Sequence, residues 1–224
     1  PENPVDRLSH VKAWYRVERR RTLIKKSELP AWFSAVEQLR EAGGPTSETI
    51  ADYLMLLLFT GLRRSEGMNL QWEDVDFVER TLIIHDTKNR EPLILPLSDF
   101  LTELLKRREG QHESSYVFPG SSGGRIIEPR KQLFKVTEWS GVAFTLHDLR
   151  RTFITVAESL ELSQYAIKHL VNHKLPNDVT AGYIIMDPER LRPAMEKITQ
   201  AILQAAGQSK TENVISIIQV QQSK

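Results

Sequence analysis

The sequence predicts a mainly helical α+β domain that carries one small antiparallel sheet. Several segments repeat apolar residues at helical spacing, as residues 146–160 do with Leu149 and Phe153 on one stripe. Before the C-terminal tail, two short runs, residues 81–84 and 93–95, are rich in β-prone residues. The chain has 224 residues, 40% of them hydrophobic, which is enough for the core of one such domain.

Composition narrows the class of protein further. The chain contains no cysteine, which excludes a disulfide scaffold and any cysteine-based metal site and fits a reducing cytoplasm. No apolar run approaches the roughly 20 residues of a membrane span, and no signal peptide is visible. The sequence begins at Pro1 without an initiator methionine, so we expect a piece of a longer cytoplasmic protein.

The basic residues are clustered, although the net charge at pH 7 is only +1. The clusters are Arg16, Arg19, Arg20, Arg21, Lys25 and Lys26, then Arg125, Arg130, Lys131 and Lys135, and finally Arg150 with Arg151. One face can therefore be basic, as nucleic-acid binding requires, while the whole chain stays near neutral. Each cluster by itself is equally compatible with an ordinary solvated surface.

The N-terminal half begins with a predicted linker followed by two helices. Residues 1–26 carry two early prolines and a late basic run, which indicates a linker between domains. We expect helices over about residues 27–39 and 47–59, where apolar residues recur at helical spacing. The break between them is marked by the helix-terminating residues Gly43, Gly44 and Pro45.

The segment after the second helix carries the first candidate site residues. Its apolar run ends at Gly61, so Arg63 is expected in the turn before a short helix that contains Glu66. The two β-prone runs that follow read as a hairpin with Lys88 at its tip.

The C-terminal half is predicted to be helical and to end in a β-prone tail. The expected helices cover about residues 98–108, 128–139, 146–160, 163–171 and 188–206. Between the last two we expect a loop from Asn172, which breaks the helical register between His169 and His173, and a short helix that carries Tyr183. Residues 116–124 are rich in glycine but lack the spacing of a phosphate-binding loop, which favours a flexible connection. The tail, residues 207–224, either docks as an edge strand in the same or a neighbouring protomer or is disordered. We assign to the core Leu56, Leu57, Leu58, Phe59, Trp72 and Trp139.

The C-terminal half also holds residues suited to phosphate chemistry. His147 and Arg150 fall in the first turn of one helix at i and i+3, so both could meet a single phosphate. Further along, His173 precedes Tyr183. A tyrosine can attack phosphorus only if the non-bridging oxygens are neutralised, which arginine forks do well. This combination favours a DNA phosphodiester as substrate, although each residue alone is more often structural.

Five motifs, in this order, resemble those of the tyrosine recombinase or phage integrase family. They are Thr-Gly-x-Arg at Arg63, a hairpin lysine at Lys88, His-x-x-Arg at His147 and Arg150, a second histidine at His173, and the tyrosine Tyr183. The resemblance covers about residues 45–200 and is strongest to integrases of prophages and genomic islands. It implies that residues 27–206 form the helical catalytic domain of a DNA breaking-rejoining enzyme. The ten positions from His173 to Tyr183 are one more than is common in the family.

The resemblance also implies the chemistry. Tyr183 would attack the scissile phosphate, leaving a 3′-phosphotyrosyl link and a free 5′-hydroxyl without ATP, metal or other cofactor. Arg63 and Arg150 would grip the non-bridging oxygens, and Lys88 would protonate the departing 5′-oxygen. The other expected residues are His147 and His173 for proton transfer and phosphate binding, Glu66 and Asp148 as carboxylates that hold the arginines, and Arg64, Arg130, Lys131, Lys135 and Arg151 as DNA contacts.

The implied function is site-specific recombination, through strand cleavage and exchange, for integration or excision of a phage or genomic island. The expected partners are double-stranded DNA at attachment sites, further protomers in a tetrameric synapse, and accessory DNA-bending proteins in the nucleoid. Two other functions stay open. A type IB topoisomerase uses a similar residue set to relax supercoils, and a non-catalytic DNA-binding protein could keep the same fold.

Overall fold

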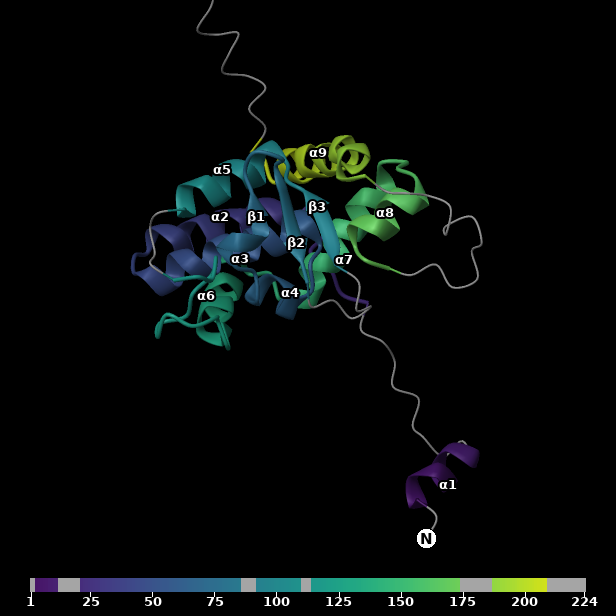
Figure 1. Cartoon of the computed structure of the whole chain (residues 1–224). Coiled ribbons are helices and arrows are strands. Elements are labelled where there is room, and N and C mark those ends of the chain that lie inside the picture. The colour runs from purple at the N-terminus through teal and green to yellow at the C-terminus, as the bar shows by residue number, and fades with distance from the viewer. Residues whose placement is uncertain (1–2, 12–20, 86–91, 110–113, 174–186, 209–224) are drawn as a thin grey trace, which may run out of the picture.

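The structure is mainly helical with one small antiparallel sheet, as the sequence predicts (Figure 1). The computed structural model describes residues 3–11, 21–85, 92–109, 114–173 and 187–208. The helices are α1 (Pro4–His10), α2 (Leu29–Glu41), α3 (Pro45–Thr60), α4 (Arg64–Met68), α5 (Asp99–Arg108), α6 (Arg130–Ser140), α7 (Leu146–Ser159), α8 (Gln164–Leu170) and α9 (Pro188–Ala205). A 3-10 turn, η1 (Trp72–Asp74), leads into strands β1 (Val75–Asp76), β2 (Thr81–Ile84) and β3 (Leu93–Pro96). No helix in the described ranges is long and apolar enough to cross a membrane.

Helix α3 lies at the centre of the fold. Helices α2, α5, α7 and α9 all contact it, and its residues 49–60 are buried. A helix that is apolar on every side has to be enclosed by other elements. It begins at Pro45, since proline is favoured at the first helical position, and ends at Gly61.

Gly61 fixes how the chain leaves α3. Its φ of 66° lies in the left-handed region, and its N–H donates to the carbonyl of Leu57 at 3.0 Å. A Cβ at this position would lie 2.6 Å from the ring of Phe153 in α7. Glycine therefore permits both the turn and the close packing of α3 on α7, and Arg63 follows at this junction.

The sheet has the order β1-β2-β3, and the β2–β3 pair runs from Thr81 opposite Pro96 to Ile84 opposite Leu93. This pair confirms the two predicted β-prone runs. Strand β1 was not predicted, because two residues are too few to show an alternating pattern. Helix α9 packs against β3 (Figure 1). Lys88 lies between β2 and β3, outside the described residues.

The remaining helices follow the sequence closely. Helices α5 to α9 all begin and end within two residues of the expected bounds. The start of α5 is fixed by Ser98, whose hydroxyl accepts a hydrogen bond from the Leu101 N–H at 3.4 Å. Helix α2 begins at Leu29 instead of Ser27, because Ser27 lies in a turn closed by the Glu28 N–H and the Lys25 carbonyl at 2.9 Å.

The burial of three side chains differs from what the sequence predicts. Ile24, inside the expected linker, is 1% exposed, and its N–H donates to the Thr152 hydroxyl of α7 at 3.0 Å. The last part of that segment therefore packs on the helical body. Trp139 was wrongly assigned to the core: it is 37% exposed, and the Lys135 ammonium lies 5.9 Å from its ring centre. Trp72 is only partly buried, whereas residues 56–59 are fully buried as predicted.

A buried carboxylate in the middle of α3 ties three helices together. Asp52 of α3 is fully buried and binds Arg40 of α2 at 2.8 Å and Arg108 of α5 at 2.9 Å. Arg107 adds a third contact at 2.8 Å. Arg108 is itself completely buried, so neither charge has water as an alternative partner.

Candidate active site

Arg63 is positioned by the start of α4. Its backbone is extended there, with φ −73° and ψ 155°, and its N–H donates to one carboxylate oxygen of Glu66 at 2.7 Å. The other Glu66 oxygen accepts from the Arg63 guanidinium, also at 2.7 Å. Glu66 is only 3% exposed, so this carboxylate is itself held in place. The buried Glu66 carboxylate thus binds both the backbone N–H and the guanidinium of Arg63, and this fixes the direction of the guanidinium.

Arg150 comes from the first turns of α7 and is buried, at 5% exposed. Its guanidinium donates to the carbonyl of Gly61, after α3, and to the carbonyl of Val171, after α8. Burial, together with the nearby positive charge of Arg63, lowers the pKa of Arg150 to about 10, against the opposing charge of Glu66. Arg150 remains a cation at neutral pH, and the two arginines lie close enough for their charges to interact.

His147 lies on the same side of α7 and is exposed. Partial burial lowers its pKa below the ordinary 6.5, and the positive charges of Arg151, Arg150 and Arg63 act in the same direction. Asp148 opposes this shift. The imidazole is therefore mainly neutral at neutral pH, and one ring nitrogen can accept a proton.

Asp148 has a different role from the expected one. Its carboxylate accepts hydrogen bonds from the N–H and hydroxyl of Thr145, which caps α7, and from the hydroxyl of Thr22. The arginine that it binds is Arg151, at 2.9 Å. Burial by itself raises the pKa of Asp148, but these hydrogen bonds outweigh burial and keep the pKa below its usual range. Among the described contacts, Glu66 is the carboxylate that holds a candidate phosphate-binding arginine.

The chain that leads to the tyrosine starts next to Arg150. Helix α8 ends at Leu170, and Asn172 then takes a left-handed φ of 48°. The expected break between His169 and His173 is therefore present. His173 is exposed, and its N–H donates to the Lys168 carbonyl at 2.8 Å. Tyr183 lies outside the described residues, as does the short helix expected to carry it.

The structure thus brings together Arg63, His147 and Arg150, from segments far apart in the sequence. The three side chains lie close enough for the charges of both arginines to lower the pKa of His147. The arrangement presents two cations and a neutral base to a common region. Such a region suits an oxyanion with several oxygens, a phosphate in particular.

The family is decided by comparison with known proteins. The model of the phage integrase family matches residues 23–190. The chain belongs to this family. It is 33% identical over 199 residues to the prophage integrase IntF of Escherichia coli (strain K12), covering 85% of this chain and 41% of that protein. It is 29% identical over 168 residues to the tyrosine recombinase XerA of Thermococcus onnurineus, covering 68% and 56%. The chain thus spans about half the length of these relatives.

Solved structures show the same fold. A lambda integrase dimer bound to a COC′ core site matches with a TM-score of 0.59 at 19% identity, over 75% of this chain and 64% of that one. The integrase from mycobacterium phage Brujita matches with a TM-score of 0.62 at 17% identity, over 86% and 65%. The fold class predicted from the sequence is therefore confirmed as that of phage integrases.

The expected DNA-contacting cations of this chain lie on α4, α6 and α7. Arg64 donates to the carbonyl of Ile127 at 2.7 Å and lies 3.6 Å from Glu128. Glu128 also lies 3.4 Å from Arg130, whose side chain is 84% exposed. The exposed residues Lys131 and Lys135 follow on α6, next to Phe134, an exposed aromatic side chain that sequence reasoning did not single out. Helical periodicity leaves Phe134 opposite the buried Val136, which is the signal that could have found it.

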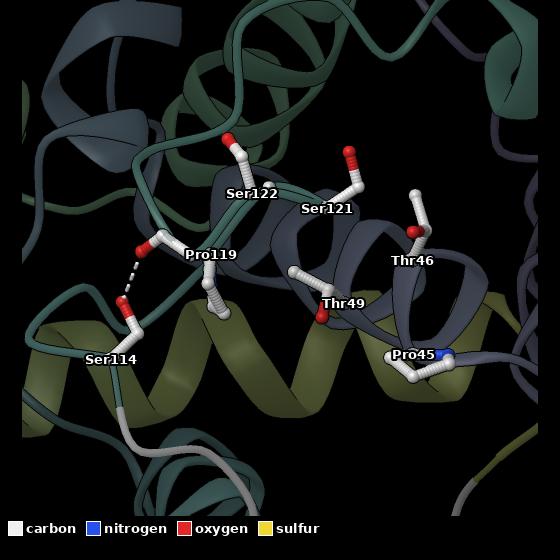
Figure 2. A pocket seen from close by; sticks show the side chains of 9 residues that line it. Pro45, Thr46, Thr49, Ser114, Pro119, Ser121 and Ser122 are labelled. Atoms are coloured by element: carbon white, nitrogen blue, oxygen red, sulfur yellow. Dashed lines mark hydrogen bonds between the residues drawn. The ribbon is translucent and has the colours of Figure 1, made fainter.

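The larger of the two described cavities lies elsewhere. It measures about 550 Å³ and is formed by the start of α3 and the glycine-rich turn around Ser121 (Figure 2). That turn is closed by the Gly120 N–H and the Gly124 carbonyl, so the expected connection is a tight one. The hydroxyls of Thr46, Ser121 and Ser122 and the ring of Pro45 line it. The converging charges lie at the opposite end of α3, so this cavity is not where the candidate chemistry gathers.

Proposed function

We propose that this chain is the catalytic domain of a site-specific recombinase that cleaves and rejoins DNA through a 3′-phosphotyrosyl intermediate. Residues 27–206 would form that domain. The observation that carries the proposal is the convergence of Arg63 and Arg150 on a region that also contains the neutral His147.

Electrostatics support a phosphodiester as the substrate. The positive charges of Arg63 and Arg150 act on each other, and the one buried carboxylate that acts on both, Glu66, balances only one of them, so the pair keeps an excess of positive charge. A phosphate bound there would relieve that excess. In the pentacovalent transition state the non-bridging oxygens gain negative charge, and fixed donors stabilise it more than they stabilise the ground state.

The proposed reaction conserves the phosphodiester bond energy. The Tyr183 oxygen bonds to phosphorus, the bond from phosphorus to the 5′-oxygen breaks, and the tyrosine proton passes to His147. Lys88 gives a proton to the departing 5′-oxygen, and His173 binds the phosphate. Religation is the same sequence in reverse, with a 5′-hydroxyl of another strand as nucleophile.

The relatives support the proposed partners. Solved matches include a lambda integrase tetramer bound to a Holliday junction and the XerH recombinase bound to difH substrate. We extend these properties to this chain: it would bind double-stranded attachment sites through α4 and α6 and assemble as a tetrameric synapse. By likeness to the prophage integrase IntF, the reaction would integrate or excise a mobile element. Accessory DNA-bending proteins would assist, and the reaction would take place in the cytoplasm, at the nucleoid.

A nicked suicide substrate tests the proposal. The DNA carries the candidate attachment site with a nick close to the cleavage position, so that a short 5′-terminal fragment diffuses away and traps the covalent intermediate. The protein is incubated with this DNA and run on a denaturing gel, beside the Tyr183→Phe variant. We expect a covalent protein–DNA adduct that the variant does not form.

The outcomes separate the alternatives. An adduct that persists in Tyr183→Phe would show that another residue is the nucleophile. Sequence-specific binding without any adduct would indicate the non-catalytic DNA-binding function. Relaxation of a supercoiled plasmid without an attachment site and without strand exchange would indicate a topoisomerase.

A further inference from the structure

Phe134 of helix α6 is an aromatic side chain that faces solvent. It is 69% exposed, whereas Leu133 beside it packs on the core and Val136 is fully buried. Phe134 therefore lies on the outward face of the helix and contributes little to the core. A single exposed apolar side chain is common on protein surfaces, so the groups around Phe134 have to indicate what it contacts.

Positive charge surrounds Phe134 on α6. Arg130 and Lys131 precede it by four and three positions, which places both beside it on the helix, and the exposed Lys135 follows it directly. The one carboxylate of α6, Glu138, lies a turn further on. Arg130 and Lys131 also occupy the first turn of α6, where the helix dipole disfavours positive charge. Their position is unfavourable for the helix itself and suits an external anion.

The segment that leads into α6 is bound to α4, the helix that follows Arg63. Arg64, the first residue of α4, donates to the carbonyl of Ile127 at 2.7 Å. Just after α4, the side-chain oxygen of Asn69 accepts a hydrogen bond from Arg125 at 2.8 Å. These two contacts fix the start of α6 relative to the proposed phosphate clamp, and α4 and α6 lie on the same side of the domain (Figure 1).

We propose that α6 lies in the major groove of bound DNA and that Phe134 is a specificity-determining residue, which contacts the C5-methyl group of a thymine. A helix about 10–12 Å across fits the major groove, which is about 12 Å wide and in which thymine presents this apolar group. Arg130, Lys131 and Lys135 bind the flanking phosphates, which position the helix but carry no sequence information. This inference rests on the proposed function and adds a base preference to it.

Replacing thymine by deoxyuracil removes this methyl group and leaves base pairing intact. Random-sequence duplexes are first selected for binding to the wild-type chain, and the consensus duplex of the bound fraction is the probe. Its thymines are replaced one at a time by deoxyuracil, and dissociation constants are measured at fixed salt. Wild type is compared with Phe134→Ala, Phe134→Leu and Lys131→Ala. Val78→Ala is the matched control, because Val78 is an 89% exposed apolar side chain in the turn between β1 and β2.

We expect deoxyuracil at one position to weaken wild-type binding about fourfold, the effect of losing one buried methyl group. Phe134→Ala should bind both bases there equally, Phe134→Leu should keep part of the preference, and Val78→Ala should match wild type. Phe134→Ala should keep the salt dependence of binding, whereas Lys131→Ala should reduce the slope of log Kd against log salt by about one. The unfolding midpoint of Phe134→Ala should equal that of wild type, because Phe134 is exposed.

Other results would overturn the inference in distinguishable ways. If deoxyuracil weakened binding at no position, or weakened it equally in wild type and Phe134→Ala, Phe134 would not contact a thymine, and the proposed function would stand. Unchanged discrimination with weaker self-association of Phe134→Ala on DNA would assign Phe134 to a contact between protomers. If the wild-type chain selected no sequence and showed no salt-dependent binding, the proposed function would fall, and the role of Phe134 with it.

Discussion

At the scale of single residues, the candidate site depends on where each arginine directs its donors. Arg150 uses two of its donors on the carbonyls of Gly61 and Val171 and so joins the ends of α3 and α8. Lysine has a point charge and no planar fork, so it cannot make both contacts and also reach a phosphate. Arg150 is therefore both a proposed phosphate ligand and the support of the segment before His173.

Replacing Arg150 by lysine should accordingly reduce cleavage although the positive charge is kept. We expect a loss of about 100-fold to 1000-fold in single-turnover cleavage, the usual effect of removing a transition-state donor. Arg151→Lys is the matched control, since Arg151 binds Asp148 and the carbonyl of Thr22 instead of joining the ends of α3 and α8. A similar loss in both variants would indicate general DNA contact instead of a specific role for Arg150.

The pKa of His147 predicts the acid side of the pH profile. Its pKa in the folded protein lies below 6.5, so cleavage should hold constant as pH falls to that value and decrease only below it. The unfolded chain takes up the proton more readily, so stability is unaffected above pH 6.5 and decreases as pH falls further. The rate of single-turnover cleavage is measured against pH, and His147→Gln should not show the decrease at acid pH. If His147→Gln kept that decrease, another group would be responsible for it.

At the scale of secondary-structure elements, the junction between α3 and α4 decides where Arg63 lies. The apolar sequence of α3 makes it a buried helix, and Gly61 ends it with a left-handed turn against Phe153. The site is thus built on the end of the most deeply buried helix. A rigid support of this kind holds a binding group more precisely than a free loop does.

Substituting Gly61 by alanine should test that junction. The change imposes both a strained φ and a clash with Phe153, and we expect a loss of about 2–4 kcal/mol in the free energy of unfolding. Gly141→Ala is the matched control, because Gly141 has a φ of 70° but nothing within 4 Å of an added Cβ. Urea unfolding of both variants separates strain from clash. Equal losses would mean that contact with Phe153 contributes nothing.

At the scale of the whole molecule, the core around α3 is held by two separate sets of charges. Arg150 and Glu66 organise the C-terminal end of α3, which carries the candidate site, while Asp52 lies near the middle of the helix. Asp52 joins α2, α3 and α5, and its main partner Arg108 is completely buried. The charges around Asp52 hold the framework and are not part of the candidate site.

Asp52→Asn should therefore destabilise the fold without changing the chemistry. Removing one partner of a buried ion pair leaves the other uncompensated, and we expect a loss of about 3–5 kcal/mol in the free energy of unfolding. Glu37→Gln removes a more exposed partner of Arg40 and should cost less than about 1 kcal/mol. Urea unfolding gives both values, and cleavage measured below the unfolding transition should match wild type. A cleavage defect in folded Asp52→Asn would show that the ion pairs of Asp52 also affect the candidate site.

The sequence by itself determined the fold class, the two strands β2 and β3 and the bounds of the helices from α2 onward, because periodicity and terminating residues such as Gly61 act locally. It missed helix α1, which lies inside the expected linker. It also indicated Arg63, His147 and Arg150 through motif spacing. It could not assign the hydrogen-bond partners of these residues. Which of Glu66 and Asp148 binds an arginine of the site depends on how α4 and α7 pack in the folded chain. The exposure of Trp139 depends in the same way on which face of α6 is covered.

Only the tertiary structure decided the long-range contacts. The pairs Asp52–Arg108, Asp74–His85 and Arg150–Val171 join residues from different elements, and no local pattern marks a charged residue that will be buried. The physical reason is that propensity and periodicity act over a few residues, whereas burial and pairing of charge are set by the packing of the whole chain.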